Sequence, residues 1–382
     1  MIFPILLGQL VPLFVNACQL EAMKTDFLAV GGGSDRTNTE IALEKNLLYF
    51  QRTLETLGYS AKRMTYLFAD GKSGQAVVRY IDPQGSEQFK QAEIPYLSGR
   101  ASWANIQAWF RSRGNSANPL FFYFTGHGLR NKSNLENNSF TVWQEPTVSV
   151  KQLAELLDTM PARPPVVVMM AQCYSGAFGN IIYRSGDPHQ AIAPQERCGF
   201  FGTIKTRTSV GCTPEVNEAD YRDYSSSFFA GLSGKDRLGR TVPSADFNQD
   251  GRVSYAEAHA FAKVDNLTTD VPISSGEIWL LRQANATLRA QASHRPIQAL
   301  ISLARPSQKY ALIGLIRLLN WDSGLSFRQN ELRRPPTNPE QEAWALRLQN
   351  ELIYVAVEQN IRHKKELQQT WERLLRCEER SP

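Results

Sequence analysis

Two long apolar stretches, each ending in polar residues, limit how this chain can fold more than any other feature of its sequence. The first is LFFYFTGHG, which ends at residue 128, and the second is VVVMMAQCYSG, which ends at residue 176. Such runs are typical of strands buried on both faces of a largely parallel sheet. Ligands of open α/β sheets bind beyond the carboxyl ends of the strands. The two runs therefore place His127 and Cys173 at one crevice.

Strand-like segments alternate with helix-period segments along the first half of the chain. FLAVGGG and MTYLFAD have the composition of strands, and TEIALEKNLLYFQRTLETLGY and ANIQAWFRSRG have the spacing of amphipathic helices. Ser149 and Gln152 stand at the spacing of a capping box, which predicts the start of a further helix. This alternation predicts an α/β fold with a mostly parallel central sheet.

The pattern changes beyond Thr287, where apolar residues recur at three- and four-residue spacing and the linker RRPPTNPE separates helical segments. This spacing predicts amphipathic helices. We therefore expect a globular domain over residues 19–286 and a helical appendage over residues 287–382. We favour packing of the helical faces on the domain over binding to a partner.

The charge of the chain gives no reason to expect a nucleic-acid partner. Its 42 Lys and Arg residues stand against 37 Asp and Glu residues, a formal net charge of +5 that is spread along the sequence. Basic residues between positions 366 and 380 are interleaved with acidic ones, as on a solvated helix face.

The N-terminus resembles an export signal. The run from Ile2 to Val15 is nearly free of charge, and it is shorter than the roughly 20 apolar residues of a membrane-spanning helix. It ends in Val-Asn-Ala-Cys, and a small residue before a cysteine is what bacterial lipoprotein signals look like. Residues 1–18 therefore predict an exported, periplasmic protein or one anchored to the membrane by a lipidated Cys18. The alternative is a buried first strand or helix in a cytoplasmic protein.

Two of the five cysteines, Cys198 and Cys212, lie close together in the Gly- and Thr-rich stretch CGFFGTIKTRTSVGC. A short strand and its return bring such residues within bonding distance. In an oxidising compartment we expect a disulfide between them. Two buried free thiols are the alternative.

The crevice residues suit acyl transfer. A thiol is mostly protonated at neutral pH, so a catalytic Cys173 requires an imidazole such as His127 as its general base. The backbone N–H groups of Gly128 and Cys173 form a candidate oxyanion hole, in which one donor contributes about 2.7 to 4 kcal/mol.

The order of these motifs resembles the caspase, legumain and gingipain group of cysteine peptidases. A strand ending in His-Gly is followed by a strand ending in Ala-x-Cys-x-x-Gly, and 46 positions (173 − 127) separate the histidine from the cysteine. The sequence Cys-Tyr-Ser-Gly is closer to that of legumain, and the chain most resembles bacterial relatives of legumain. The resemblance covers roughly residues 27–281. It implies a caspase-like three-layer sandwich with a mostly parallel sheet, and a thiol endopeptidase that acts on proteins or peptides through an acyl-enzyme.

The same resemblance implies a substrate pocket. Arg36 matches an arginine that lines the primary substrate pocket of legumain-like enzymes. Ser209 lies in a segment that resembles the one forming another wall of this pocket. Asp223 matches the acid that faces the arginine. Such a pocket favours cleavage after asparagine. The alternative is that the acids Glu215, Glu218, Asp220 and Asp223 select arginine or lysine, as in metacaspases and Arg-type gingipains. Legumain orients its histidine with an asparagine, and because this chain offers Ser34 and Asp35 there, the third catalytic residue is not identified.

Residues 246–257, DFNQDGRVSYAE, match an EF-hand-type calcium loop. Gly251 allows the sharp turn, and no second loop accompanies this one, which favours a structural ion over a sensor. The ligands that the pattern predicts are Asp246, Asn248, Asp250, Arg252 through its carbonyl, Ser254 and Glu257. We expect bound Ca²⁺ and no organic cofactor.

Three alternatives stay open at this point. The first is a catalytically silent, calcium-stabilised binding module that retains the fold. An acyl-enzyme resolved by an amine would give transpeptidation, as in relatives of legumain. The helices of residues 287–382 are either an inhibitory segment, as the C-terminal helices of legumain are, or an appendage that only packs on the domain.

Overall fold

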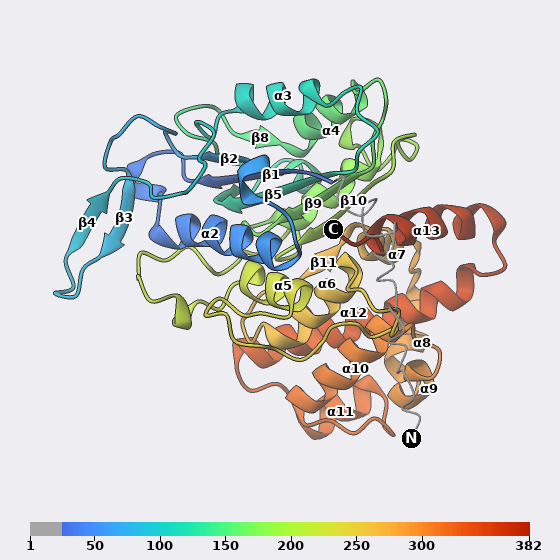
Figure 1. Cartoon of the computed structure of the whole chain (residues 1–382). Helices are drawn as coiled ribbons and strands as arrows, with labels where there is room; N and C mark the ends of the chain where they lie inside the picture. Colours follow the sequence, from blue (N-terminus) through green and yellow to red (C-terminus); the bar gives the residue numbers. More distant parts are fainter. Residues whose placement is uncertain (1–24) are drawn as a thin grey trace, which may run out of the picture.

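A six-stranded sheet forms the centre of the protein, whose computed structural model describes residues 25–382. The strands follow the order β2–β1–β5–β9–β10–β11 (Figure 1). All neighbours are parallel except β10 and β11, which confirms the mostly parallel sheet. The predicted signal at residues 1–18, with Cys18, lies outside the described residues. The strands are β1 (Asp26–Gly32), β2 (Thr65–Phe68), β5 (Leu120–Gly126), β9 (Val166–Met170), β10 (Arg197–Phe201) and β11 (Ile273–Ser274).

Helices cover both faces of this sheet, so the predicted three-layer α/β sandwich is confirmed (Figure 1). α3 (Trp103–Ser112) and α4 (Val150–Asp158) pack on one face. α2 (Ile41–Thr56), α5 (Tyr224–Ser233) and α6 (Tyr255–Asp265) pack on the other.

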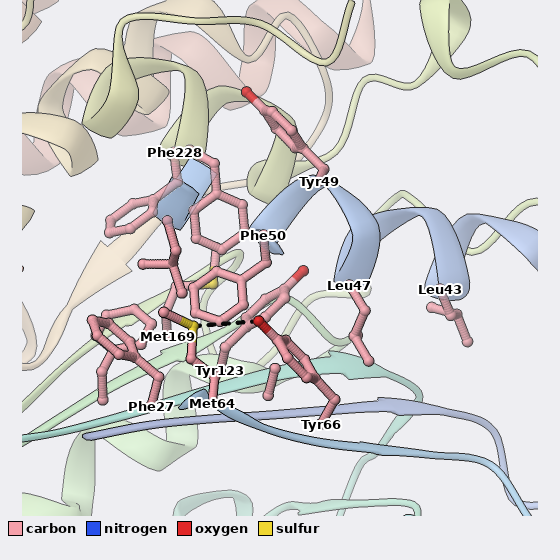
Figure 2. Close-up of a cluster of buried hydrophobic side chains, with 14 of the residues drawn as sticks. Phe27, Leu43, Leu47, Tyr49, Phe50, Met64, Tyr66, Tyr123, Met169 and Phe228 are labelled. Atoms are coloured by element: carbon pink, nitrogen blue, oxygen red, sulfur yellow. Dashed lines mark hydrogen bonds between the residues drawn. The ribbon is translucent and has the colours of Figure 1, made fainter. Parts of the chain in front are cut away.

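Alternate residues of each central strand enter these two layers. Phe121 and Tyr123 of β5 belong to the core under α2, whereas Phe122 and Phe124 belong to the core under α3 and α4. Figure 2 shows Phe50 of α2 directed towards the sheet, and its ring stacks on that of Phe121 with centroids 5.9 Å apart. Burial on both faces explains why β5 and β9 are apolar at nearly every position.

Two small antiparallel sheets extend from the sandwich. One is a hairpin of β3 and β4, and the other joins β6, β7 and β8 just beyond β5. The predicted capping box of Ser149 and Gln152 begins α4. The bounds are β3 (Val78–Ile81), β4 (Glu87–Lys90), β6 (Gly128–Leu129), β7 (Ser139–Phe140) and β8 (Val148–Ser149). Short 3-10 helices are η1 (Arg36–Asn38), η2 (Ala61–Arg63), η3 (Leu135–Asn137), η4 (Ser175–Ile182), η5 (Arg184–Gly186) and η6 (Glu218–Asp220).

The C-terminal part of the chain is helical and shares a third apolar core with the end of the sandwich domain. The helices are α7 (Ser275–Gln283), α8 (Ala286–His294), α9 (Ile297–Ile301), α10 (Pro306–Leu319), α11 (Phe327–Arg333), α12 (Pro339–Ile361) and α13 (Lys365–Glu378). Within residues 25–382, no helix is long and apolar enough to span a membrane.

Buried polar contacts join these helices to the sandwich. The guanidinium of Arg347 in α12 is buried and donates to the backbone carbonyls of Lys263, Asn266, Thr268 and Asp270. Leaving a buried carbonyl without a donor costs about 1–3 kcal/mol. The C-terminal helices are therefore part of the folded unit in this structure.

The expected disulfide between Cys198 and Cys212 is wrong, because Cys198 is bonded to Cys377 of α13. Cys198 is a buried residue of β10 whose side chain lies in the same core as Cys377. Cys212 is exposed and has a free thiol, because the chain beyond β10 runs along the carboxyl edge of the sheet instead of returning beside β10. Proximity in sequence was misleading here, since the strand separates the two side chains.

We predict that Cys377→Ser lowers the free energy of unfolding by up to about 5 kcal/mol, because the disulfide closes a loop spanning 179 residues. Urea denaturation of the oxidised protein measures this loss. Cys212→Ser is the matched control and should lower the midpoint far less, since that thiol is free and closes no loop. Equal stability of all three proteins would contradict the assigned pairing.

Candidate active site

The pairing of β5 with β9 brings the two predicted catalytic residues together. The strands are parallel and in register up to Phe124 opposite Met170. His127 and Cys173 each follow their partner residue by three positions, so both lie just beyond the same edge of the sheet. Neighbouring strands are about 4.8 Å apart, which keeps the two turns adjacent.

Gly128 lets these two turns touch. A Cβ atom at this position would lie 2.0 Å from the carbonyl oxygen of Cys173, a distance that no side chain tolerates. The backbone of the His-Gly turn therefore packs directly against the nucleophile turn. Glycine is required here for close approach of two backbones.

Cys173 lies in a strained turn that holds its sulfur in place. The next residue, Tyr174, has a φ of 58° in the left-handed region. The N–H of Ser209 donates to the Cys173 Sγ at 3.3 Å, and the thiol is 3.6 Å from the Ser209 carbonyl oxygen. Burial raises the pKa of the Cys173 thiol above its ordinary value, although the Ser209 N–H acts in the opposite direction. The free thiol is half-buried, as a nucleophile that must meet a substrate requires.

The backbone N–H of Cys173 has no hydrogen-bond acceptor among residues 25–382. It lies in the turn just beyond β9, beside the Gly128 backbone, where the predicted oxyanion hole requires a donor.

His127 is oriented by two groups that sequence inspection did not identify. Its Nε2 lies 3.0 Å from the Asn38 carbonyl oxygen and 3.0 Å from the Glu40 Oε2. Glu40 is buried, and Arg79 fixes its other oxygen at 2.8 Å. Asp35, which was considered for this role, instead caps η1 by accepting from the Thr37 N–H at 2.8 Å.

The signal for Glu40 was weak. It precedes the first residue of α2, where an acidic residue is commonly interpreted as a favourable helix start. Only the path of the chain over the sheet edge brings this carboxylate to the imidazole.

The electrostatics of His127 involve a second sulfur. Burial lowers its pKa, but side-chain contacts with Cys212 and Glu40 outweigh this effect and raise the pKa to about 11. The same contact with His127 lowers the pKa of Glu40 against the effect of burial. Among residues 25–382, no hydrogen bond joins His127 to Cys173, so in this state the sulfur partner of the imidazole is Cys212.

Residues 203–214 form a band across the carboxyl edge of the sheet, and this band explains the position of Cys212. Its contacts, in chain order, are Arg207 with Tyr174, Ser209 with Cys173, Cys212 with Gly126 and Thr213 with Ala42. The band therefore forms one side of the crevice in which both catalytic turns lie.

A buried acid supports this band. The carboxylate of Asp270 accepts from the Ser209 hydroxyl at 3.0 Å and from the Val210 N–H at 3.1 Å. Burial raises the pKa of Asp270 to about 7. The backbone carbonyl of the same residue accepts from Arg347 of α12 at 2.8 Å. A C-terminal helix thus acts through Asp270 on the segment that holds the Cys173 sulfur.

The predicted substrate-binding residues Arg36 and Asp223 do not face each other as unpaired charges. Arg36 is exposed, and its guanidinium lies 3.8 Å from the centroid of the Phe89 ring. Asp223 is buried and pairs with Arg237 at 3.1 Å. Burial raises the pKa of Asp223, but Arg237 and the α5 N-terminus more than offset this and keep it below its ordinary value. Ser209 alone of the three directly contacts a catalytic residue.

The predicted calcium loop has part of the arrangement that an ion requires. The Asp246 carboxylate accepts from the N–H groups of Asp250 and Gly251, and the Asn248 side-chain oxygen accepts from the Asp250 N–H at 2.9 Å. Gly251 has a φ of 85°, so the sharp turn is present. These hydrogen bonds fold the loop into the turn that the pattern predicts.

Glu257 fits less well. One of its oxygens accepts from the Phe247 and Asn248 N–H groups, and the other accepts from Ser254, with which it forms a capping box. Both oxygens would have to share or exchange these hydrogen bonds to hold a metal ion. Arg252 has its N–H bonded to the Asp250 carboxylate, as in a tight Asx turn.

Comparisons with known proteins give little further guidance. No protein-family model matches the chain, and no curated protein matches it either. The crystal structure of protein GSU0716 from Geobacter sulfurreducens is similar over 66% of this chain and 92% of that chain, with 13% identity and a TM-score of 0.39. A likeness at this level carries no argument about function.

We predict that Glu40→Gln lowers the pKa of His127, because it removes the negative charge that stabilises the imidazolium. The imidazole proton resonances followed by NMR during a pH titration measure the change. A raised pKa in the folded state stabilises the fold fully below about pH 6.5 and loses this effect as the pH rises through about 11, so the variant should lose stability chiefly at neutral and lower pH.

Glu87→Gln is the matched control for this experiment. Glu87 is the other carboxylate bound by Arg79, at 3.1 Å, but it is half-exposed and does not contact His127. An unchanged His127 pKa in Glu40→Gln, or an equal change in both variants, would contradict the orienting role of Glu40.

Proposed function

We propose that this chain is a cysteine endopeptidase that hydrolyses peptide bonds through an acyl-enzyme on Cys173. The observation that carries this proposal is the in-register pairing of β5 and β9, which places Cys173 and His127 in adjacent turns at one edge of the sheet. The sandwich fold agrees with what the resemblance to caspases and legumain implies. The oriented imidazole and the unpaired Cys173 N–H supply the other parts that acyl transfer requires.

The proposed reaction has two halves. The Cys173 proton passes to solvent or to neutral His127, and the thiolate attacks the peptide carbonyl while the N–H groups of Cys173 and Gly128 bind the developing oxyanion. Protonated His127 then gives its proton to the leaving amine. In the second half, neutral His127 takes a proton from water, which attacks the thioester and releases the acid. The raised pKa of His127 favours the protonated form that the leaving amine requires.

The surroundings of Asp223 support the asparagine preference over the arginine or lysine alternative. Selection of a basic side chain requires an acid without a cationic partner in the pocket. Of the four acids, Asp223 is paired with Arg237 and Glu218 is paired with Arg52, so neither of these carboxylates is free. Glu215 and Asp220 are exposed. We propose an uncharged amide side chain at the cleavage site, with Ser209 and Arg36 as candidates to bind it.

An electrophilic peptide tests the nucleophile. We predict that a peptidyl chloromethyl ketone labels the full chain once, and that Cys173→Ala abolishes both labelling and hydrolysis of a peptide library. Tryptic mass spectrometry locates the label. Cys212→Ala is the matched control, because it removes the other free thiol among residues 25–382 and should keep the label on Cys173.

Two outcomes would contradict the proposal. A label on Cys212 that survives Cys173→Ala would assign the nucleophile to the band. A folded chain with no label on either sulfur would favour the silent binding module. Product masses separate hydrolysis from transpeptidation, since only ligation adds an amine to the acyl product.

We also propose that the protein is exported, either to the periplasm or to a membrane through lipidated Cys18. The disulfide between Cys198 and Cys377 supports an oxidising compartment, because such bonds are rare in the reducing cytosol.

Finally, we propose that residues 246–257 bind one Ca²⁺ as a structural ion. Bound Ca²⁺ should raise the thermal unfolding temperature, and Asp250→Ala should remove this increase, because it deletes a ligand. The control is Glu366→Gln at an exposed acidic position, which should retain the full increase. Thermal melts with calcium and with chelator measure the effect, and an equal calcium response in both variants would exclude this loop as the site.

A further inference from the structure

A mixed set of metal-ligating side chains lies beside the proposed catalytic turn. One side-chain ligand atom each from Glu40, His127 and Cys212 all lie within 4.8 Å of one another. The three residues come from separate parts of the chain: the start of α2, the turn after β5 and the band of residues 203–214. The fold brings them together, and sequence spacing does not suggest the group.

The chemistry of this set suits one class of ion. Thiolate, imidazole and carboxylate together favour Zn²⁺ over hard cations, which prefer oxygen ligands alone. Zinc bonds of 2.0–2.1 Å in a tetrahedron separate two N or O ligands by about 3.3 Å. The His127 Nε2 and Glu40 Oε2 are 3.0 Å apart, so their present separation is close to this value.

The surroundings also fit a site that an ion reaches from solvent. Glu40 is buried, His127 is partly exposed and Cys212 is exposed. One ligand is therefore held in the protein interior, and another is accessible to solvent. The carbonyl oxygen of Asn38 lies 3.0 Å from the same His127 nitrogen and offers a fourth ligand atom for the metal ion. Arg79 fixes the outer oxygen of Glu40, as groups around a metal ligand commonly do.

We propose that Zn²⁺ binds reversibly to Glu40, His127 and Cys212, and that the bound ion blocks the site. Binding displaces the Cys212 thiol proton and the imidazolium proton to solvent, so it weakens as the pH falls. An imidazole bound to zinc cannot carry protons for Cys173. The blocking effect rests on the proposed peptidase function, whereas the binding does not.

Cys173 is not needed for this site, and this separates the two functions experimentally. Its sulfur is held by the backbone of Ser209 and does not hydrogen-bond to His127. A Cys173→Ala chain therefore keeps all three proposed ligands. It also has no nucleophile, so metal binding is measured without turnover.

The binding test uses the full-length Cys173→Ala chain without an added histidine tag. Competition with a chromophoric zinc chelator should give one Zn²⁺ per chain, and Co²⁺ substitution should give a thiolate-to-metal absorption band. Adding Cys212→Ser should remove this band and weaken Zn²⁺ binding by about 100-fold or more, and adding Glu40→Gln should weaken it at least about 10-fold. Adding Asp250→Ala is the matched control and should leave both readouts unchanged.

An unchanged zinc affinity after Cys212→Ser, or a Co²⁺ spectrum without the thiolate band, would overturn the site. In the chain that retains Cys173, low zinc concentrations should inhibit hydrolysis, and Cys212→Ser should make inhibition require about 100-fold more zinc. Zinc binding without any hydrolysis would overturn the peptidase proposal alone. Hydrolysis with no effect of Cys212→Ser on inhibition would overturn the blocking role alone.

Discussion

The register between β5 and β9 is the constraint on which the rest of the site depends. Both strands are buried on both faces, so a slip of one residue would move every apolar side chain to the opposite layer. The cores above and below the sheet therefore fix the register. Because His127 and Cys173 follow the last paired residues by the same three positions, the packing of the sandwich also fixes where the imidazole and the thiol lie.

The C-terminal helices help to hold the segments that lie at the same edge of the sheet. Arg347 holds the backbone of the segment that ends at Asp270, and the Asp270 carboxylate holds the band that contacts the Cys173 sulfur. The Cys198–Cys377 disulfide joins α13 to β10 on the same sandwich. An inhibitory segment that is released to activate the enzyme would have to break these buried contacts. These contacts favour the interpretation that α12 and α13 stabilise the sandwich domain over the interpretation that they are a removable inhibitor.

Periodicity and apolar runs were sufficient to predict the sheet, the flanking helices and the common location of His127 and Cys173, and the spacing of Ser149 and Gln152 predicted the capping box. These features depend on local pattern and on a general property of parallel sheets. The positions of Glu40 and Cys212 could not be predicted, because they depend on how connecting segments cross the sheet edge. The disulfide was assigned wrongly for the same reason: Cys377 is distant in sequence, and only the packing of α13 brings it to Cys198.

A crystal structure of the full chain after reaction with a peptidyl aldehyde tests the central claim most directly. Our account predicts a bond between the aldehyde carbon and the Cys173 Sγ, with the resulting oxygen about 2.7–3.1 Å from the N–H groups of Cys173 and Gly128. The His127 ring should keep its contacts with Asn38 and Glu40. An adduct on Cys212, or a Cys173 adduct whose oxygen points away from both N–H groups, would contradict the account.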